Sequence, residues 1–172
     1  MIIIAIGANL DIQSQSNKYQ TCINALRYLN EKNICTIIKT SDWFETTAWP
    51  DPKKPPYING VAIVEPQTDS PKKFLEQLHD VEAYFGRERL EKWGNRTIDL
   101  DILLWNNICT INQNTTQGLA IPHPRMLERA FVLLPLAQIA PNIVIPNTSL
   151  TIQEHLQHLQ YDSKDISLYK KA

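Results

Sequence analysis

The sequence has no long apolar run and almost no net charge, and these two absences exclude several classes of protein. The apolar stretch at 1–6 is far shorter than the about 20 residues that a membrane-spanning helix needs, and no basic residues precede it as in a signal peptide. We therefore expect a buried strand there, with no membrane association. The formal net charge of −1 argues against binding nucleic acid through a basic surface.

Cysteine is also scarce, and a phosphate-binding glycine motif is missing. The three cysteines, Cys22, Cys35 and Cys109, are widely spaced and form no Cys-x-x-Cys pair. This spacing favours reduced thiols over a zinc site or a disulfide framework, and we expect a cytoplasmic protein. The chain has no Gly-x-x-x-x-Gly-Lys-Ser/Thr segment, which excludes a P-loop kinase.

The composition that remains is that of an ordinary globular protein. Of 172 residues, 43% are hydrophobic and 20% are charged, so we expect one domain, 1–172, with a sizeable core and no room for a second catalytic domain. The polar tail at 161–172 is expected to be frayed.

Hydrophobic periodicity and turn residues predict an alternation of strands and helices. Ser70 and Pro71 have the residue types of a helix N-terminus, and Gly86 those of its end. Strands are predicted at 2–6, 34–40 with continuation to 44, 57–64, 98–105 with 108–111 as a hairpin partner, and 143–145; helices are predicted at 17–30, 71–85, 128–140 and 149–159. This order predicts an α+β fold, a ferredoxin-like α/β sandwich with an antiparallel sheet and a β-α-β-β-α-β core plus C-terminal helices.

Two carboxylates, Asp99 and Asp101, alternate with apolar residues in the predicted strand at 98–105. Alternate residues of a strand share one face, so the carboxylates lie close together while Ile98, Leu100 and Ile102 face the core. Such a pair repels unless a cation lies between them, and Mg²⁺ prefers carboxylate oxygens together with phosphates and water. An Asp-x-Asp strand is also compatible with a merely solvated sheet face.

A basic cluster precedes the carboxylates and favours the functional interpretation. Arg87, Arg89, Lys92 and Arg96 supply donors suited to phosphate. Together with the carboxylates they indicate metal-assisted chemistry on a polyphosphate. The alternative is a non-catalytic ferredoxin-like module that binds nucleotide or RNA. Acidic residues on the sheet face argue against it, and Mg²⁺ dependence of ATP binding would separate the two hypotheses.

The order and spacing of five segments resemble those of the 6-hydroxymethyl-7,8-dihydropterin pyrophosphokinases. These segments are Ile4-Ala-Ile-Gly-Ala-Asn-Leu10, Tyr57-Ile-Asn59, Trp93-Gly-Asn-Arg-Thr-Ile-Asp-Leu-Asp-Ile102, Pro122-His-Pro-Arg125 and Glu128-Arg-Ala-Phe-Val-Leu133. The family transfers the β,γ-diphosphate of ATP to the hydroxymethyl group of the dihydropterin in folate biosynthesis and releases AMP. The resemblance implies small-molecule substrates, no nucleic-acid or membrane partner, and a monomer.

The resemblance also implies roles for individual residues. Asp99 and Asp101 would hold two Mg²⁺ ions, and with Arg87 and Arg96 would form the catalytic set. ATP would be bound by Glu82, Arg87, Arg89, Lys92, Arg96, Ile102, His123 and Arg129. The pterin would be bound by Thr46, Thr47, Trp49, Tyr57, Asn59, Trp93 and Phe131. The amide of Asn59 offers a donor and an acceptor to the ring edge, and Trp93 and Phe131 would sandwich the ring. No residue stands out as a general base.

Overall fold

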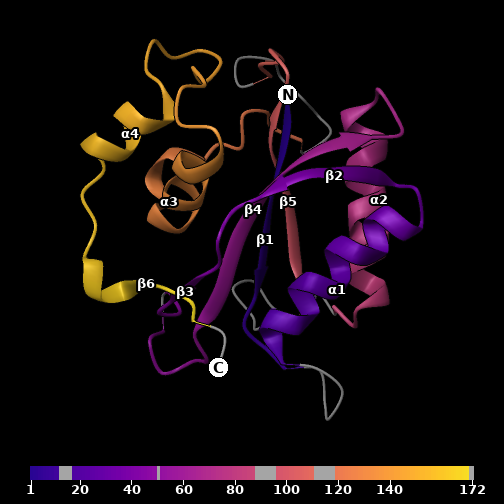
Figure 1. Ribbon diagram of the computed structural model, residues 1–172, viewed down its shortest axis with the longest axis horizontal. Coiled ribbons are helices and arrows are strands. Elements are labelled where there is room, and N and C mark those ends of the chain that lie inside the picture. The colour runs from indigo at the N-terminus through magenta and orange to yellow at the C-terminus, as the bar shows by residue number, and fades with distance from the viewer. Residues whose placement is uncertain (12–16, 50, 88–95, 111–118, 171–172) are drawn as a thin grey trace.

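A computed structural model describes residues 1–11, 17–49, 51–87, 96–110 and 119–170. The elements are β1 (Ile2–Ala8), α1 (Lys18–Glu31), β2 (Cys35–Thr40), β3 (Phe44–Thr46), β4 (Tyr57–Pro66), α2 (Pro71–Tyr84), β5 (Asp99–Trp105), the 3₁₀ turn η1 (Met126–Glu128), α3 (Ala130–Ile139), α4 (Ile152–His158), the 3₁₀ turn η2 (Ser163–Asp165) and β6 (Ile166–Leu168). Figure 1 shows their arrangement.

The strands form one antiparallel sheet with the order β5-β1-β4-β3-β6. β2 and β3 pair with successive parts of the same edge of β4. The expected ferredoxin-like α+β architecture with an antiparallel sheet is therefore confirmed.

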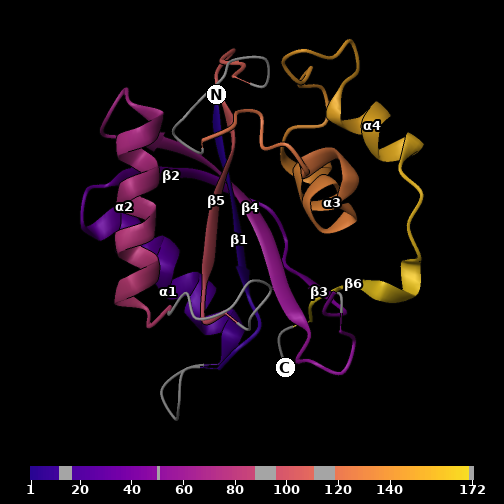
Figure 2. The same ribbon diagram turned by 180° about the vertical axis from the view of Figure 1, so that it is seen from behind.

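The two faces of the sheet are covered by different pairs of helices (Figures 1 and 2). On one face, Ile4 and Ile6 of β1 join a core with Leu29 of α1 and Phe74 of α2. On the other face, a second core joins sheet residues to Leu136 of α3 and Ile152 of α4. Because alternate strand residues point to opposite faces, β1 contributes to both cores. Within the described part of the chain, no helix combines the length and the apolar composition that a membrane span requires.

Local sequence explains where the first two long helices begin. Asn17 caps α1 by accepting a hydrogen bond from the Gln20 backbone N–H, at 2.8 Å. Ser70 caps α2 in the same way, and Pro71 occupies its first turn. Gly86 follows α2 with a φ of +77°, a conformation that glycine adopts without strain.

Three elements differ from their predicted extent. β2 does not continue to residue 44: it ends at Thr40, the Val61 N–H donates to the Ser41 hydroxyl, and β3 begins anew at Phe44. The predicted hairpin partner of β5 is wrong over its described part, 108–110, where Ile108 closes a turn on the Trp105 carbonyl and Thr110 bonds to Ile121. The predicted strand at 143–145 is reduced to one bridge, between Val144 and Thr151.

Two further boundaries also differ from the prediction. The helix predicted from 128 instead begins with η1, a break at Arg129, and α3. The expectation of a frayed tail is wrong over its described part, 161–170, because β6 pairs with β3 at the edge of the sheet. This places the C-terminal segment beside β3, which carries Thr46, one of the residues expected to bind the pterin.

Candidate active site

Asp99 and Asp101 lie on the face of β5 that opens into a large pocket. Their partners on β1 are Gly7 and Ala5, whose small size leaves room beside both carboxylates. Leu100 lies between them on the opposite face and belongs to the α1/α2 core. The predicted placement of the two carboxylates on one face is confirmed.

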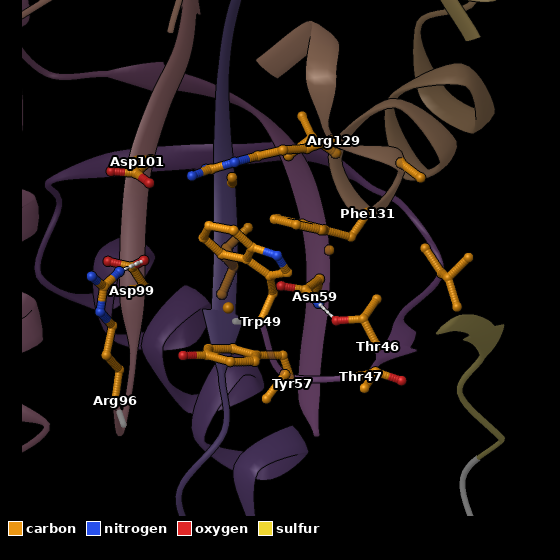
Figure 3. Close-up of a pocket in the computed structure, with 18 of the residues that line it drawn as sticks. Thr46, Thr47, Trp49, Tyr57, Asn59, Arg96, Asp99, Asp101, Arg129 and Phe131 are labelled. Atoms are coloured by element: carbon orange, nitrogen blue, oxygen red, sulfur yellow. Dashed lines mark hydrogen bonds and ion pairs between the residues drawn. The ribbon is translucent and has the colours of Figure 1, made fainter. Parts of the chain in front are cut away.

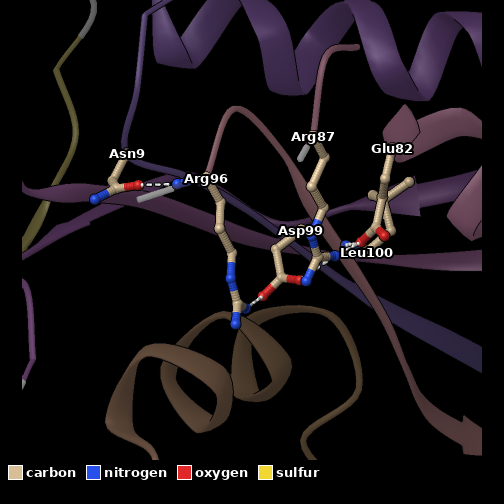
Figure 4. A network of polar contacts seen from close by, with 6 residues as sticks. All are labelled: Asn9, Glu82, Arg87, Arg96, Asp99 and Leu100. Carbon is tan, nitrogen blue, oxygen red and sulfur yellow. Dashed lines mark hydrogen bonds and ion pairs between the residues drawn. The ribbon is translucent and has the colours of Figure 1, made fainter. Parts of the chain in front are cut away.

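Asp99 is held between two arginines (Figure 4). Arg87 Nη1 lies 2.7 Å from Asp99 Oδ1, and Arg96 forms an ion pair with Oδ2. Arg96 is fixed through its backbone, because its N–H donates to Asn9 Oδ1 at 2.7 Å and its carbonyl accepts from the Asn9 N–H at 3.0 Å. The arginines thus converge on the carboxylate from the two described ends of the connection between α2 and β5.

Glu82 lies behind this group and only 2% of it is exposed. It forms an ion pair with Arg87 and accepts a hydrogen bond from the Leu100 N–H at 2.7 Å. Burial raises the pKa of the Glu82 carboxyl to about 7, although the Leu100 hydrogen bond and Arg87 oppose this shift. Glu82 therefore ties α2 to β5 and orients Arg87, and it does not reach the pocket wall.

Asp101 has an electrostatic environment that favours a bound cation. Burial, followed by the charge of Asp99, raises the pKa of Asp101 to about 6, while the guanidinium of Arg129 acts in the opposite direction. Arg129 extends toward Asp101 in Figure 3. Within the described ranges, no cluster of three or more His, Cys, Asp or Glu side chains could hold a metal. Two carboxylates fit a hard cation whose remaining ligands are phosphate and water oxygens.

His123 lines the same pocket as a neutral hydrogen-bond donor. Burial and the nearby charge of Arg129 lower its pKa to about 4. Its Nδ1 accepts a hydrogen bond from the Arg125 N–H at 3.2 Å, so the proton of the neutral ring is on Nε2. An Nε2–H group can donate to a phosphate oxygen.

The other end of the pocket is aromatic and carries an oriented amide (Figure 3). Asn59, 7% exposed on β4, donates from Nδ2 to Thr46 Oγ1 at 2.8 Å. Tyr57 and Phe131 line this end, and the Trp49 ring lies 5.9 Å from the Arg125 guanidinium. An amide between aromatic rings suits a flat heterocycle that has both donors and acceptors.

The pocket has a volume of about 1570 Å³, above the ~300–1,000 Å³ typical of a site for one small ligand. It therefore has space for two substrates. Most expected residues meet here: Thr46, Thr47, Trp49, Tyr57, Asn59, Arg87, Arg96, Asp99, Asp101, His123, Arg129 and Phe131 all line it. Ile102 does not, because it lies in the core on the opposite face. Arg89, Lys92 and Trp93 lie outside the described residues.

Sequence reasoning missed several lining residues. Arg125 was visible only as part of a motif, and Asp162, Asp165 and Ile166 come from the segment expected to fray. Only the Asp162 cap and the two apolar residues of Ile166-Ser-Leu168 hint at local order there, and this signal is weak.

Paired carboxylates, converging arginines and a separate aromatic amide end define an enzyme that handles a polyphosphate and a flat second substrate. Comparison with known proteins gives the family. Residues 3–141 match the model of the 7,8-dihydro-6-hydroxymethylpterin-pyrophosphokinase (HPPK) family. The chain therefore belongs to this family. It is a pyrophosphokinase of folate biosynthesis that uses ATP, as expected, and the non-catalytic alternative is not favoured.

Individual relatives agree with this assignment. The chain is 36% identical over 147 residues to the 2-amino-4-hydroxy-6-hydroxymethyldihydropteridine pyrophosphokinase of Haemophilus influenzae, covering 86% of each protein. It is 40% identical over 123 residues to the Synechocystis enzyme of the same name, covering 72% of this chain and 60% of that one. A solved Plasmodium falciparum HPPK-DHPS variant with pterin and p-hydroxybenzoate has a TM-score of 0.69 at 14% identity. That match covers 97% of this chain but 46% of the other, and it supports the fold alone.

Proposed function

We propose that the two ends of this pocket hold the two substrates of diphosphate transfer, one substrate at each end. ATP lies at the Asp99–Asp101 end, and 6-hydroxymethyl-7,8-dihydropterin lies at the Asn59 end. The observation that carries this proposal is the sheet register, in which Asp99, Gly7 and Asn59 are successive partners on β5, β1 and β4.

Asn59 is the residue that recognises the pterin. Thr46 Oγ1 accepts one amide proton, which fixes Asn59 so that Oδ1 and the second amide proton remain for the ring edge. A ring bound in this way projects its hydroxymethyl group across Gly7 toward Asp99. Phe131 and Tyr57 supply the aromatic surfaces around it, with Thr47 and Trp49 completing this end.

Asp99 and Asp101 are proposed to hold two Mg²⁺ ions together with phosphate oxygens. When bound, the ions would neutralise charge on the diphosphate and bring the attacking oxygen into line. The raised pKa of Asp101 fits this role, since its carboxylate gains most from a nearby cation.

The basic side chains stabilise the phosphates during transfer. Arg87 and Arg96 already lie at Asp99, and a bound diphosphate offers them stronger bidentate partners. Arg129 and the Nε2–H of His123 donate from the opposite side of the pocket. The pterin hydroxyl oxygen then bonds to the β-phosphorus and gives up its proton to solvent. The bond from the β-phosphorus to the α,β-bridging oxygen breaks, and AMP leaves with that oxygen.

Two more general expectations stay proposals. We infer that the protein acts as a monomer, and that its three free cysteines suit the reducing cytoplasm.

Steady-state kinetics with variants at each end tests the assignment. Asn59→Ala should raise KM for the pterin and leave KM for ATP unchanged. His123→Phe should do the reverse. Asp80→Asn, at an exposed position on α2, is the control and should behave as wild type. Equal changes in both KM values for Asn59→Ala would overturn the proposed assignment of the two substrates to the two ends.

A further inference from the structure

The C-terminal strand β6 lies beside β3 in both views of the molecule and lines the pocket through Ile166 (Figures 1 and 2). The family match ends at residue 141, so it does not include this strand. We propose that β6 is a positioning element for the pterin end, and that Ile166 limits the size of the pterin edge that can bind. This inference depends on the proposed role of Asn59 in pterin binding.

Backbone hydrogen bonds join β6 and its flanking residues to the β3 segment at both ends. At one end, the Thr47 N–H donates to the Asp165 carbonyl at 3.0 Å. At the other, the Tyr169 N–H donates to the Trp43 carbonyl at 2.7 Å, and the Tyr169 ring stacks on Tyr19 of α1 with centroids 5.1 Å apart. The strand is therefore anchored to the body of the protein through both backbone and side chain.

β3 has only three residues, so it depends on its neighbours for its position. β4 supports one edge and β6 supports the other. Thr46 lies on β3 and accepts the hydrogen bond that orients Asn59. A continuous series of contacts thus runs from β6 through Thr46 to the amide that we assign to the pterin.

Ile166 occupies the outer end of the pocket. It is the direct partner of Thr46, and both side chains line the cavity. The pairs Thr47–Asp165 and Trp43–Tyr169 are hydrogen-bonded, so the alternation of an antiparallel ladder makes Thr46–Ile166 a non-hydrogen-bonded pair with close side chains. In the strand order, β6 lies beyond β4 as seen from β5. Ile166 shares a row with Thr46 and Tyr57, next to the row that runs from Asp99 through Gly7 to Asn59. Because Ile166 also lines this end of the pocket, we expect a substituent on the 2-amino group of a pterin held by Asn59 to meet it.

The same alternation supplies a matched pair of variants. The partners Glu45 and Ser167 form a hydrogen-bonded pair, so the Ser167 N–H points toward β3, whereas the Leu168 N–H points to the open edge. Both side chains are exposed. Ser167→Pro removes a ladder hydrogen bond, and Leu168→Pro introduces proline without that loss.

The test is calorimetric titration of the full chain with 6-hydroxymethylpterin, in the presence of Mg²⁺ and a non-hydrolysable ATP analogue. For Ser167→Pro we expect the pterin Kd to rise about 2- to 12-fold, as loss of one hydrogen bond predicts, with the Kd of the analogue unchanged. Leu168→Pro should match wild type. Equal pterin affinities for the two proline variants would overturn the positioning role.

Two further variants keep the outcome decisive. The ratio of the Kd for an N2-alkylated pterin to the Kd for the parent pterin should be lower for Ile166→Ala than for wild type. This result does not depend on Ser167→Pro being folded. An unchanged ratio would overturn the role of Ile166.

Asn59→Ala separates this proposal from the proposed function. If it loses pterin affinity while the β6 variants do not, only the β6 proposal fails; if it keeps full affinity, the pterin end itself is misassigned.

Discussion

Asp99 and Asn59 lie in one row of the sheet, with only Gly7 between them. Strand spacing of about 4.8 Å separates their backbones by roughly 10 Å. Asp99 carries the carboxylate that we propose binds a metal, and Asn59 carries the amide that we propose binds the pterin. The missing side chain at Gly7 leaves the floor between them open, so a ring held at Asn59 can reach the phosphate end without obstruction.

Substituting Gly7 by alanine should therefore affect the pterin and spare ATP. A Cβ at this position would lie 3.1 Å from Asn59 Oδ1, which forces the amide to shift. We expect KM for the pterin to rise about 2- to 12-fold, the equivalent of one weakened hydrogen bond, with KM for ATP unchanged. Steady-state kinetics at saturating co-substrate measures both values. A larger effect on ATP than on the pterin would contradict the role of this row.

Asp99→Asn and Asp101→Asn should abolish most turnover without unfolding the protein. Each removes one of the two carboxylates available to a cation, and loss of one preorganised electrostatic group costs about 100- to 1000-fold in kcat. Rates at increasing Mg²⁺ concentration, with melting curves alongside, measure the effect. Asp80→Asn is the matched control at an exposed site. Near wild-type kcat in either active-site variant would show that the pair does not hold the metal.

Much of this arrangement could be predicted from the sequence, because it follows from strand periodicity. The alternation at 98–105 placed Asp99 and Asp101 on one face, and Ser70-Pro71 and Gly86 marked the ends of α2 correctly. These features depend on short-range rules that apply to each segment by itself.

Other features depend on contacts between distant segments and could not be predicted in this way. β6 forms only because β3 offers it a free edge and Tyr19 stacks on Tyr169. Glu82 has the helical spacing of an inner residue, but its partners Arg87 and the Leu100 N–H belong to other elements. The roles of individual pocket residues, and the single-domain organisation, stay predictions.

Glu82→Gln should separate stability from activity. The folded-state pKa of about 7 lies above the usual 4.5, so the folded protein binds this proton more tightly than the unfolded chain does. Wild-type stability therefore declines as pH rises from 4.5 to 7, and the neutral variant escapes this loss. Between pH 5 and pH 8 we therefore expect wild type to lose up to about 3 kcal/mol of stability that Glu82→Gln does not lose, the value of a shift of this size.

The same variant should nevertheless be slower, because Arg87 loses the carboxylate that orients it. Urea unfolding at pH 5 and pH 8, with kcat at pH 8, tests both statements. Glu82→Asp keeps the charge but shortens the reach, and it should lose activity while its stability still depends on this titration. A Glu82→Gln enzyme whose stability falls between pH 5 and pH 8 as much as that of wild type would refute the linkage.

His123 should remain neutral throughout the physiological range. Its pKa of about 4 follows from burial and the charge of Arg129, and the Nδ1 contact leaves the proton on Nε2. We expect its ring ¹⁵N signals to titrate near pH 4 and to show the Nε2–H tautomer at pH 7. Between pH 6 and pH 8, the KM for ATP should then depend on pH in the same way in wild type and in His123→Phe, because His123 does not titrate in this range.

The central claim is the transfer of an intact diphosphate between the two ends of one pocket. The most direct test is to incubate the protein with ATP, Mg²⁺ and 6-hydroxymethyl-7,8-dihydropterin and to separate the nucleotide products by chromatography. AMP that appears only with the pterin present, in equal amount to the pterin diphosphate, is the expected result. Formation of ADP, or of AMP without the pterin, would contradict the claim.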